Sequence, residues 1–352
     1  MAFITYKGVG IKAISACVPP KIMYNKDLGY LIPEDDIKKI IETIGISEKR
    51  YAESDVCTSD LCFKAAQKLI EDNQIDLETI DGLIFVSQTP DYRVPATAPS
   101  LQDRLGLKQG CLSFDINLAC SGYVYGLSIA YSLATQMGIN RILLLVGDTL
   151  SKIVSTKDKM TVPLFGDAGT ASLIEKGDYP ESYFSLNSDG KGAEIMQIPY
   201  GGYRFPSSPE GFKEITYDEV SVVNGENIQM KGMDVFNFGV KVVVSDIKKL
   251  LNSCGKTTED IEVLLFHQAN RFMTDFFSKR LKISEEKTPF SMFRFGNTSS
   301  ASVPLTIVSE MHDKEKYPHR NCVIMSGFGG GLSWGTSLVS LADTQISELV
   351  EY

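Results

Sequence analysis

Short, wholly apolar segments recur along this chain, and an amphipathic segment separates each from the next. The apolar segments are rich in Leu, Ile and Val and do not alternate with polar residues, a pattern typical of strands covered on both faces of a sheet. They are Asp81–Ser87, Arg141–Gly147, Ile261–Phe266 and Asn321–Ser326. The segments with helical spacing are Thr58–Glu71, Ser121–Gly138, Val235–Cys254 and Ala301–His312. Strands that alternate with helices predict an α/β fold built in layers.

The order of segments in the first half of the chain is faintly repeated in the second half. Asp81–Thr89 resembles Ile261–Ala269, and each follows an amphipathic helix and an acidic turn. Arg141–Asp148 with the later sequence FGDAGT resembles Asn321–Gly327 with FGGGLSWG in the same way. Two similar halves, 1–180 and 181–352, are the favoured interpretation, and chance similarity between buried strands is the alternative.

Charge and cysteine usage exclude several classes of function. A net charge of −9 over 352 residues disfavours a nucleic-acid partner. No segment reaches the ~18 apolar residues that span a bilayer. The N-terminus lacks the pattern of a secretory signal, so a cytoplasmic location is expected. The seven cysteines are scattered and form no CxxC pair, so neither a disulfide framework nor a metal site is expected.

The stretch 199–227 departs from the layered pattern. It contains several glycines and prolines without a clear period. A long irregular stretch in a compact domain is often a functional loop or lid. A solvated insertion is the alternative, and the sequence does not decide between them.

Cys120 stands between a predicted strand and a predicted helix in the sequence FDINLACSGYVYGL. At a helix N-terminus the unpaired N–H groups and the helix dipole favour a thiolate. Many α/β enzymes present a nucleophile on such a strand-to-helix elbow. For this segment alone, however, a buried structural cysteine is the more frequent outcome.

Two further polar residues and a glycine turn follow other apolar segments. His267 ends a predicted strand, at the edge where α/β sheets bind ligands, and a histidine that only packs is the alternative. Asn297 precedes a run of small residues; it either caps the next helix or donates a hydrogen bond to an oxyanion. Gly329–Gly331 suit a turn whose backbone N–H groups meet a ligand, although the spacing fits no phosphate-binding motif.

Together these segments resemble β-ketoacyl-acyl-carrier-protein synthase III, a decarboxylating condensing enzyme of the thiolase superfamily. The matching sequences cover nearly the whole chain. They are TPDYRVPATA, NLACSGYVYGL, FGDAGTA, QMKGMDVF, LLFHQAN, FGNTSSASVP and GFGGGLSWG. The resemblance implies an α/β thiolase-like fold, in which two duplicated halves form a five-layer α-β-α-β-α sandwich with the site between them.

The resemblance also implies a role for each site residue. Cys120 would hold the acyl primer as a thioester. His267 and Asn297 would bind the malonyl thioester carbonyl and stabilise the enolate formed as carbon dioxide leaves. The backbone N–H groups of Cys120 and Gly330 would form an oxyanion hole, and Phe328 would disfavour the carboxylate of the extender. The residues expected at the acyl pocket or the carrier are Val94, Gly232, Asn270 and Arg271.

The implied partners are an acyl carrier protein, an acyl thioester and a second copy of the chain in a homodimer. The substrates would arrive on phosphopantetheine, with no permanently bound cofactor. Val94 stands where the family often has an aromatic residue that closes the partner's acyl pocket, so we expect a primer longer or more branched than acetyl. Lys39 replaces the tryptophan that stacks on the adenine of coenzyme A, so we expect a carrier-bound primer, with coenzyme A as the alternative donor.

Other departures and alternatives complete the reading of the sequence. Thr43 and Lys159 also replace arginines of the family, and Phe272 stands where an arginine often contacts the carrier, which leaves Arg271, Lys279 and Arg280 as docking candidates.

One alternative function is acyl transfer from Cys120 to an oxygen or nitrogen nucleophile without decarboxylation. A carrier-binding scaffold without activity is a second alternative. The set of Cys, His and Asn favours condensation, because forming an enolate requires the last two.

Overall fold

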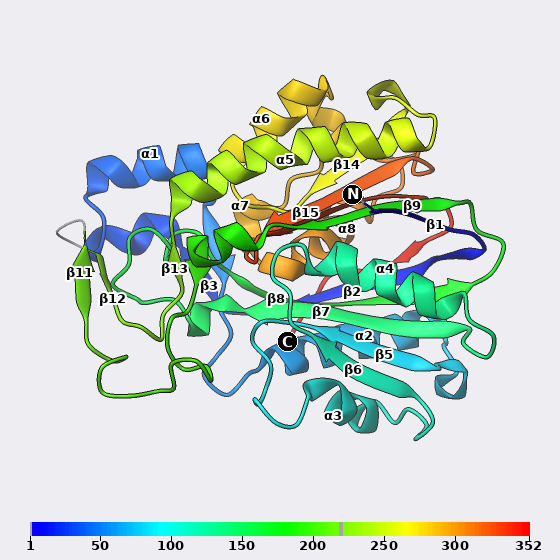
Figure 1. The fold of residues 1–352 in the computed structure, drawn as a ribbon, viewed down its shortest axis with the longest axis horizontal. Coiled ribbons are helices and arrows are strands. Elements are labelled where there is room, and N and C mark those ends of the chain that lie inside the picture. The colour runs from blue at the N-terminus through cyan, green and yellow to red at the C-terminus, as the bar shows by residue number, and fades with distance from the viewer. Residues whose placement is uncertain (1, 218–220) are drawn as a thin grey trace.

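The computed structural model describes residues 2–217 and 221–352, in which two stacked β-sheets lie between layers of helices (Figure 1). The first sheet has the strand order β17-β2-β8-β7-β5-β6, and β18 also pairs with β2. The bounds of these strands are β2 Val9–Val18, β5 Gly82–Val86, β6 Leu112–Ile116, β7 Arg141–Thr149, β8 Asp167–Lys176, β17 Gln345–Ile346 and β18 Val350–Glu351. β5 runs parallel to both β6 and β7.

The second sheet has the strand order β1-β9-β16-β15-β14. Its strands are β1 Ala2–Tyr6, β9 Ser182–Ser188, β14 Val263–Phe266, β15 Val323–Gly329 and β16 Ser333–Val339. β14 and β15 are parallel, with Phe266 opposite Ser326. The polar residues that follow these strands therefore meet at one edge of the sheet.

Helices fill three layers around the two sheets, as the side-on view in Figure 1 shows. Those between the sheets are α4 Gly122–Ala134 and α8 Ser302–Met311. Those outside the first sheet are α2 Thr58–Asn73 and α3 Thr97–Arg104, and those outside the second are α5 Gly232–Ser253 and α6 Arg271–Leu281. This order of layers confirms the predicted α-β-α-β-α sandwich.

Smaller elements lie at one end of the sandwich and in the connections. They are α1 Glu34–Ile44, α7 Met292–Phe295, β3 Ile22–Tyr24, β4 Glu48–Arg50, β10 Met196–Gln197, β11 Ile215–Tyr217, β12 Ser221–Val223 and β13 Gln229–Met230. Single turns of 3-10 helix occur among them, including Ser299–Ala301 just before α8. The irregular stretch predicted at 199–227 is organised around the antiparallel pair β11 and β12, and its residues 218–220 lie outside the described residues.

The central layer is the largest part of the apolar core. Side chains of α4 and α8 pack there against both sheets. A Cβ atom added to Gly126 would lie 2.9 Å from a methyl carbon of Val86 and 3.0 Å from one of Leu144. Glycine at this position therefore allows the close packing that sets α4, and Cys120 before it, against the end of β5.

The predicted secondary structure is confirmed, with small shifts at the ends of elements. The helix predicted from Thr58 begins at that residue, and the helix predicted from Ser121 begins at Gly122 but ends earlier, at Ala134. The chain passes from the first sheet to the second between β8 and β9, near residue 180. The terminal strands do not follow this division. β1, near the N-terminus, pairs with β9 of the second sheet, whereas β17 and β18, near the C-terminus, pair with β2 of the first sheet. The division into halves 1–180 and 181–352 stays a prediction.

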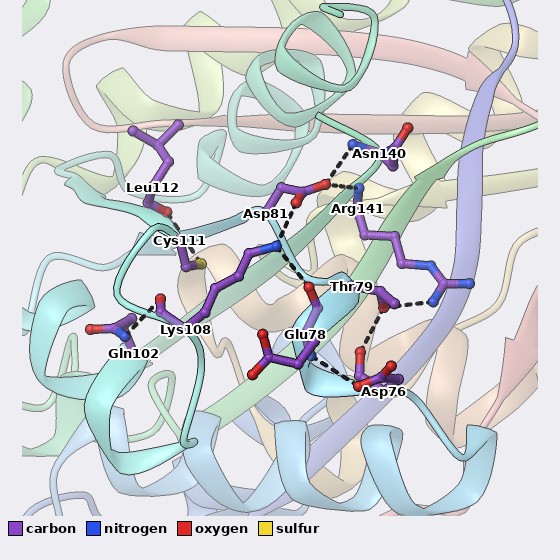
Figure 2. Close-up of polar contacts among 10 residues, drawn as sticks. All are labelled: Asp76, Glu78, Thr79, Asp81, Gln102, Lys108, Cys111, Leu112, Asn140 and Arg141. Carbon is purple, nitrogen blue, oxygen red and sulfur yellow. Dashed lines mark hydrogen bonds and ion pairs between the residues drawn. The ribbon is translucent and has the colours of Figure 1, made fainter. Parts of the chain in front are cut away.

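A polar network surrounds the starts of two strands of the first sheet (Figure 2). The carboxylate of Asp81 accepts hydrogen bonds from the backbone N–H of Asn140 at 2.8 Å and from the Lys108 ammonium at 2.9 Å. Arg141 extends the network through a hydrogen bond to the Thr79 hydroxyl at 2.8 Å. These contacts join the starts of β5 and β7, and they pair the charges of Asp81 and Lys108. The network therefore has a structural role.

Candidate active site

Cys120 lies in the turn that joins β6 to α4, next to the N-terminus of that helix. Its side chain is buried, with an exposed fraction of 6%. Burial raises the pKa of the thiol to about 12; the Ser299 hydroxyl opposes this rise, and the charge of Asp148 adds to it. The direction is opposite to the lowered pKa that a helix N-terminus led us to expect. Cys120 is therefore a neutral thiol near pH 7 in this structure.

The glycine-rich turn at the end of β15 passes directly over Cys120. A Cβ atom added to Gly329 would lie 2.8 Å from the Cys120 Cβ and 3.0 Å from its Sγ. One added to Gly327 would lie 2.8 Å from the Cys120 carbonyl oxygen. The hydroxyls of Ser121 and Ser333, 2.7 Å apart, connect the start of α4 to β16 beyond the turn. Glycine is needed at Gly327 and Gly329 so that the second sheet can approach the nucleophile.

His267 follows β14 directly, and its buried ring meets that of Phe328 edge-on, with centroids 5.5 Å apart. The Nδ1 atom lies 2.8 Å from the Ser302 hydroxyl oxygen, which also accepts a hydrogen bond from the Gln268 backbone N–H at 3.4 Å. When the Ser302 hydroxyl donates to Nδ1, the neutral ring carries its proton on Nε2. Burial lowers the pKa of His267 to about 3, so the ring is neutral at physiological pH.

Asn297 is held in place by backbone hydrogen bonds to the segment Leu164–Gly166, just before β8. Its backbone N–H donates to the Leu164 carbonyl at 2.8 Å, and its carbonyl accepts from the Gly166 N–H at 3.1 Å. The side-chain oxygen accepts a hydrogen bond from the Ser299 N–H at 2.9 Å. Because that bond uses the amide oxygen, the NH₂ group is the part of the amide that remains for the cavity Asn297 lines.

Cys120, His267 and Asn297 line a single cavity of about 80 Å³, between the ends of the two sheets. Of the other predicted residues, Phe328, Gly232 and Asn270 line the same cavity. The remaining walls are mainly apolar: Leu164, Met196, Met230, Val235, Phe236, Ala269, Met273 and Gly329. An enclosed apolar wall strengthens the electrostatic effect of the few polar groups that face it.

A second cavity of about 360 Å³ lies beside the first, and Gly330 lines this one instead. The backbone of Asn117–Ala119, just before Cys120, forms part of its wall. Met196 lines both cavities, and its sulfur would lie 3.7 Å from a Cβ atom added to Gly330. Met196 therefore stands between the nucleophile and the larger space.

Val94 and Arg271 lie outside the cavity of Cys120, and Asn270, which lines it, has a second contact. Val94 is 78% exposed in the loop before α3. Asn270 caps α6, since its side-chain oxygen accepts from the Met273 N–H at 2.8 Å. Arg271 is outside the cavity of Cys120: its guanidinium pairs with Glu285 at 2.5 Å and with Asp275 at 3.4 Å.

Sequence reasoning missed the contributions of Ser299, Ser302 and Met196. The two serines belong to the run Asn297-Thr-Ser-Ser-Ala-Ser302, which was interpreted only as small residues that open a helix. An excess of serine next to a candidate catalytic asparagine was the available signal. Met196 gave no signal, because it lies in the two-residue strand β10, far from the motifs in sequence.

The structure adds two observations on metals and membranes. Within residues 2–217 and 221–352, His, Cys, Asp and Glu side chains form no cluster of three or more that could hold a metal ion. In the same residues no helix combines the length and apolarity needed to cross a bilayer.

The five-layer sandwich, with Cys, His and Asn meeting between its sheets, places this chain in the thiolase superfamily. It is 37% identical to the beta-ketoacyl-[acyl-carrier-protein] synthase III of Natranaerobius thermophilus, over 94% of this chain and 98% of that protein. Residues 114–190 match the family model 3-oxoacyl-[acyl-carrier-protein] synthase III, and residues 251–341 match the model of its C-terminal part. The chain belongs to the 3-oxoacyl-[acyl-carrier-protein] synthase III family.

Other relatives and a solved structure agree with this assignment. The corresponding protein of Caldanaerobacter subterraneus subsp. tengcongensis is 36% identical, over 94% of this chain and 97% of that protein. The crystal structure of a 3-oxoacyl-(acyl-carrier protein) synthase from Burkholderia xenovorans LB400 superposes with a TM-score of 0.91 at 35% identity, covering 100% of this chain and 99% of that one. The family match includes Cys120 in the first model and both His267 and Asn297 in the second.

Proposed function

We propose that this chain catalyses a decarboxylative Claisen condensation between an acyl primer held on Cys120 and a malonyl group on acyl carrier protein, as a step in fatty acid or specialised acyl-chain biosynthesis. The observation that supports it most is the single cavity shared by Cys120, neutral His267 and Asn297. The relatives named above are 3-oxoacyl synthases that act with acyl carrier protein, in agreement with this proposal.

The first half-reaction is acyl transfer to the sulfur of Cys120. The sulfur attacks the carbonyl carbon of the primer thioester, the bond from that carbon to the donor's sulfur breaks, and the thiol proton of Cys120 leaves with the donor thiol. The backbone N–H groups of Cys120 and Gly330 stabilise the tetrahedral oxyanion. Such a donor is typically worth about 10²–10³ in rate.

The second half-reaction begins with loss of carbon dioxide from the malonyl group. Nε2–H of His267 and the NH₂ group of Asn297 donate hydrogen bonds to the malonyl thioester oxygen, on which negative charge develops. The edge contact of Phe328 with His267 places an apolar ring beside the reacting carboxylate, which favours its departure as neutral carbon dioxide. The enolate carbon then attacks the acyl-Cys120 carbonyl, and the thiolate of Cys120 leaves.

The choice of primer follows from the space around Cys120. The cavity at the sulfur is small, and the larger cavity beyond Met196 has room for an acyl chain. With Val94 in its exposed loop, where the family often has an aromatic residue, a partner subunit would leave this space partly open. The preferred primer is therefore longer or more branched than acetyl.

Exposed apolar side chains near Val94 support a homodimer. Tyr92, Tyr203 and Phe205 are 68%, 81% and 53% exposed. Arg93 joins the two segments that carry them, because its guanidinium donates to the Gly201 carbonyl and lies 6.0 Å from the Tyr203 ring. Contiguous exposed apolar surface is typical of a protein interface.

The carrier protein meets a different face. Acidic carriers need cations to dock against, and Lys279 and Arg280 in the last turn of α6 supply them, while Arg271 is already paired with two acids. Lys39, in place of the adenine-stacking tryptophan, lies 3.2 Å from Asp36 on α1. These features favour a carrier-bound donor over coenzyme A.

The decisive experiment is intact-protein mass spectrometry with a panel of acyl donors on carrier protein and on coenzyme A, with and without malonyl-carrier protein. An acyl adduct that is absent in Cys120→Ala identifies the nucleophile. Formation of a ketoacyl product identifies condensation. An acyl adduct without any ketoacyl product would favour plain acyl transfer instead.

A further inference from the structure

Ser299 has a backbone conformation that is unusual for its residue type. Its φ angle is +51°, in the left-handed region that glycine favours and that costs other residues free energy. The chain on both sides of it is fixed by contacts with the first sheet and its connections. Asn297 is bonded to the segment Leu164–Gly166, and the Ser300 hydroxyl donates to the buried Asp148 carboxylate at 2.8 Å. Such anchors can hold a strained residue in place.

The strained conformation directs two different groups of Ser299 at two site residues. Its backbone N–H donates to the Asn297 side-chain oxygen at 2.9 Å. Its hydroxyl oxygen lies 3.8 Å from the Cys120 sulfur, within hydrogen-bonding range for a sulfur atom, and the same hydroxyl also interacts with the buried Asp148 carboxylate. Ser299 itself is buried, so water does not compete for either group.

We infer that Ser299 is a positioning residue for both half-reactions of the proposed condensation, on which the inference rests. Its N–H fixes the Asn297 amide with the NH₂ group toward the substrate. Its hydroxyl orients the Cys120 sulfur and donates to it once the sulfur carries negative charge, both as the thiol proton is lost and when the thiolate is expelled after condensation.

The charges around Cys120 make this hydroxyl important. Burial is the main cause that raises the pKa of the thiol, and the carboxylate of Asp148, at the end of β7, raises it further. His267, from the second sheet, faces the same cavity in its neutral form and adds no positive charge. The Ser299 hydroxyl is the strongest influence that lowers the pKa of Cys120, and the Asp148 carboxylate competes for the same hydroxyl proton. A hydrogen bond to a charged group is worth more than one between neutral groups.

The test uses the thiol directly and needs no substrate. The rate of iodoacetamide alkylation of Cys120 is measured from pH 6 to pH 10 by mass spectrometry of the Cys120 peptide. Ser299→Ala removes the hydroxyl, and Ser299→Gly removes it while also relieving the backbone strain. Both are expected to slow alkylation at pH 7.5 about fivefold and to move the profile to higher pH. A rate equal to that of the unchanged protein in either variant overturns the inference.

A second measurement separates the two contacts. Both variants keep the N–H that holds Asn297, so decarboxylation of malonyl-carrier protein is expected to fall by less than alkylation does, whereas Asn297→Ala should lose it. A loss of decarboxylation equal to the loss of alkylation would mean general damage to the site and would overturn the inference. Ser309→Ala, on the neighbouring helix α8, is the matched control. Failure of the unchanged protein to form any ketoacyl product would instead refute the proposed function, leaving the alkylation result intact.

Discussion

The Nδ1 atom of His267 lies 2.8 Å from the hydroxyl oxygen of Ser302, a contact that joins the histidine to the first turn of the next element in the site. Ser302 begins α8 in the central layer, whereas His267 follows β14 of the second sheet. The Gln268 N–H donates to the same hydroxyl oxygen, whose own proton can be donated to Nδ1. We expect the Ser302 hydroxyl to donate to Nδ1 and so to keep the ring proton on Nε2.

Ser302→Ala is expected to slow malonyl decarboxylation about tenfold or more, since Nδ1–H becomes as favourable as Nε2–H and the ring loses its orientation. Acylation of Cys120 should change little, because the proposed reaction does not use His267 in that step. Both rates are measured separately, by release of carbon dioxide and by the acyl adduct.

The matched control for Ser302→Ala is Ser309→Ala on the same helix. The Ser309 hydroxyl is buried and has no hydrogen-bond partner among residues 2–217 and 221–352, so its removal breaks no hydrogen bond there. Equal losses of decarboxylation and acylation in Ser302→Ala would argue against a role in the tautomer and for a general disturbance of α8.

The buried neutral state of His267 predicts how stability depends on pH. Its pKa is about 3 in the folded protein and about 6.5 in an unfolded chain, so between these values the unfolded state binds more protons. This contribution to stability is complete above pH 6.5 and is lost as the pH falls toward 3. Its slope approaches about 1.4 kcal/mol per pH unit in the middle of that window.

The measurement is urea unfolding of the protein and of His267→Gln between pH 7.5 and pH 5. The free energy of unfolding should fall more steeply with acidification in the unchanged protein than in His267→Gln, which has no imidazole to protonate. His319→Gln controls for the loss of one exposed histidine. Parallel curves for the unchanged protein and His267→Gln would show that the imidazole is not held neutral by burial.

The layered fold and the three central site residues were accessible from sequence because their signals are local. Apolar runs such as Arg141–Gly147 identify buried strands. Cys120 and His267 each follow a predicted strand, and Asn297 precedes the small residues that open a helix. Pairing over long distances leaves no such signal. Nothing in Ala2–Tyr6 indicates that it pairs with β9, in register with Ser182–Leu186. The raised pKa of Cys120 was also inaccessible, because it depends on how completely the second sheet covers the sulfur.

Gly329→Ala should abolish most of the acylation of Cys120 while leaving the protein folded. The added Cβ atom would lie 2.8 Å from the Cys120 Cβ and 3.0 Å from its Sγ, so the side chain of Cys120 must move. A displacement of about 1 Å in a reacting atom can cost about 10² in rate. The acyl adduct is followed over time by mass spectrometry, and the melting temperature reports on folding.

Gly190→Ala provides the comparison for this variant, because a Cβ atom added at Gly190 meets no heavy atom within 4 Å. It should acylate at the normal rate. If Gly329→Ala did so as well, the close approach of β15 to Cys120 would have no consequence for catalysis.

Met196 separates the cavity at Cys120 from the larger one beside it, so its size should set the length of the primer. Met196→Ala joins the two cavities and is expected to raise the preference for long or branched acyl groups about tenfold relative to acetyl, since each further buried methylene is worth about 0.8 kcal/mol. Met196→Phe, with a rigid ring at the same place, should restrict acylation to the shortest primers. Equimolar mixtures of acyl-carrier proteins are offered to each variant, and the adducts on Cys120 are compared. Met137→Ala, at a side chain that is 98% exposed, should keep the original preference. An unchanged distribution of adducts in both Met196 variants would place the acyl chain elsewhere.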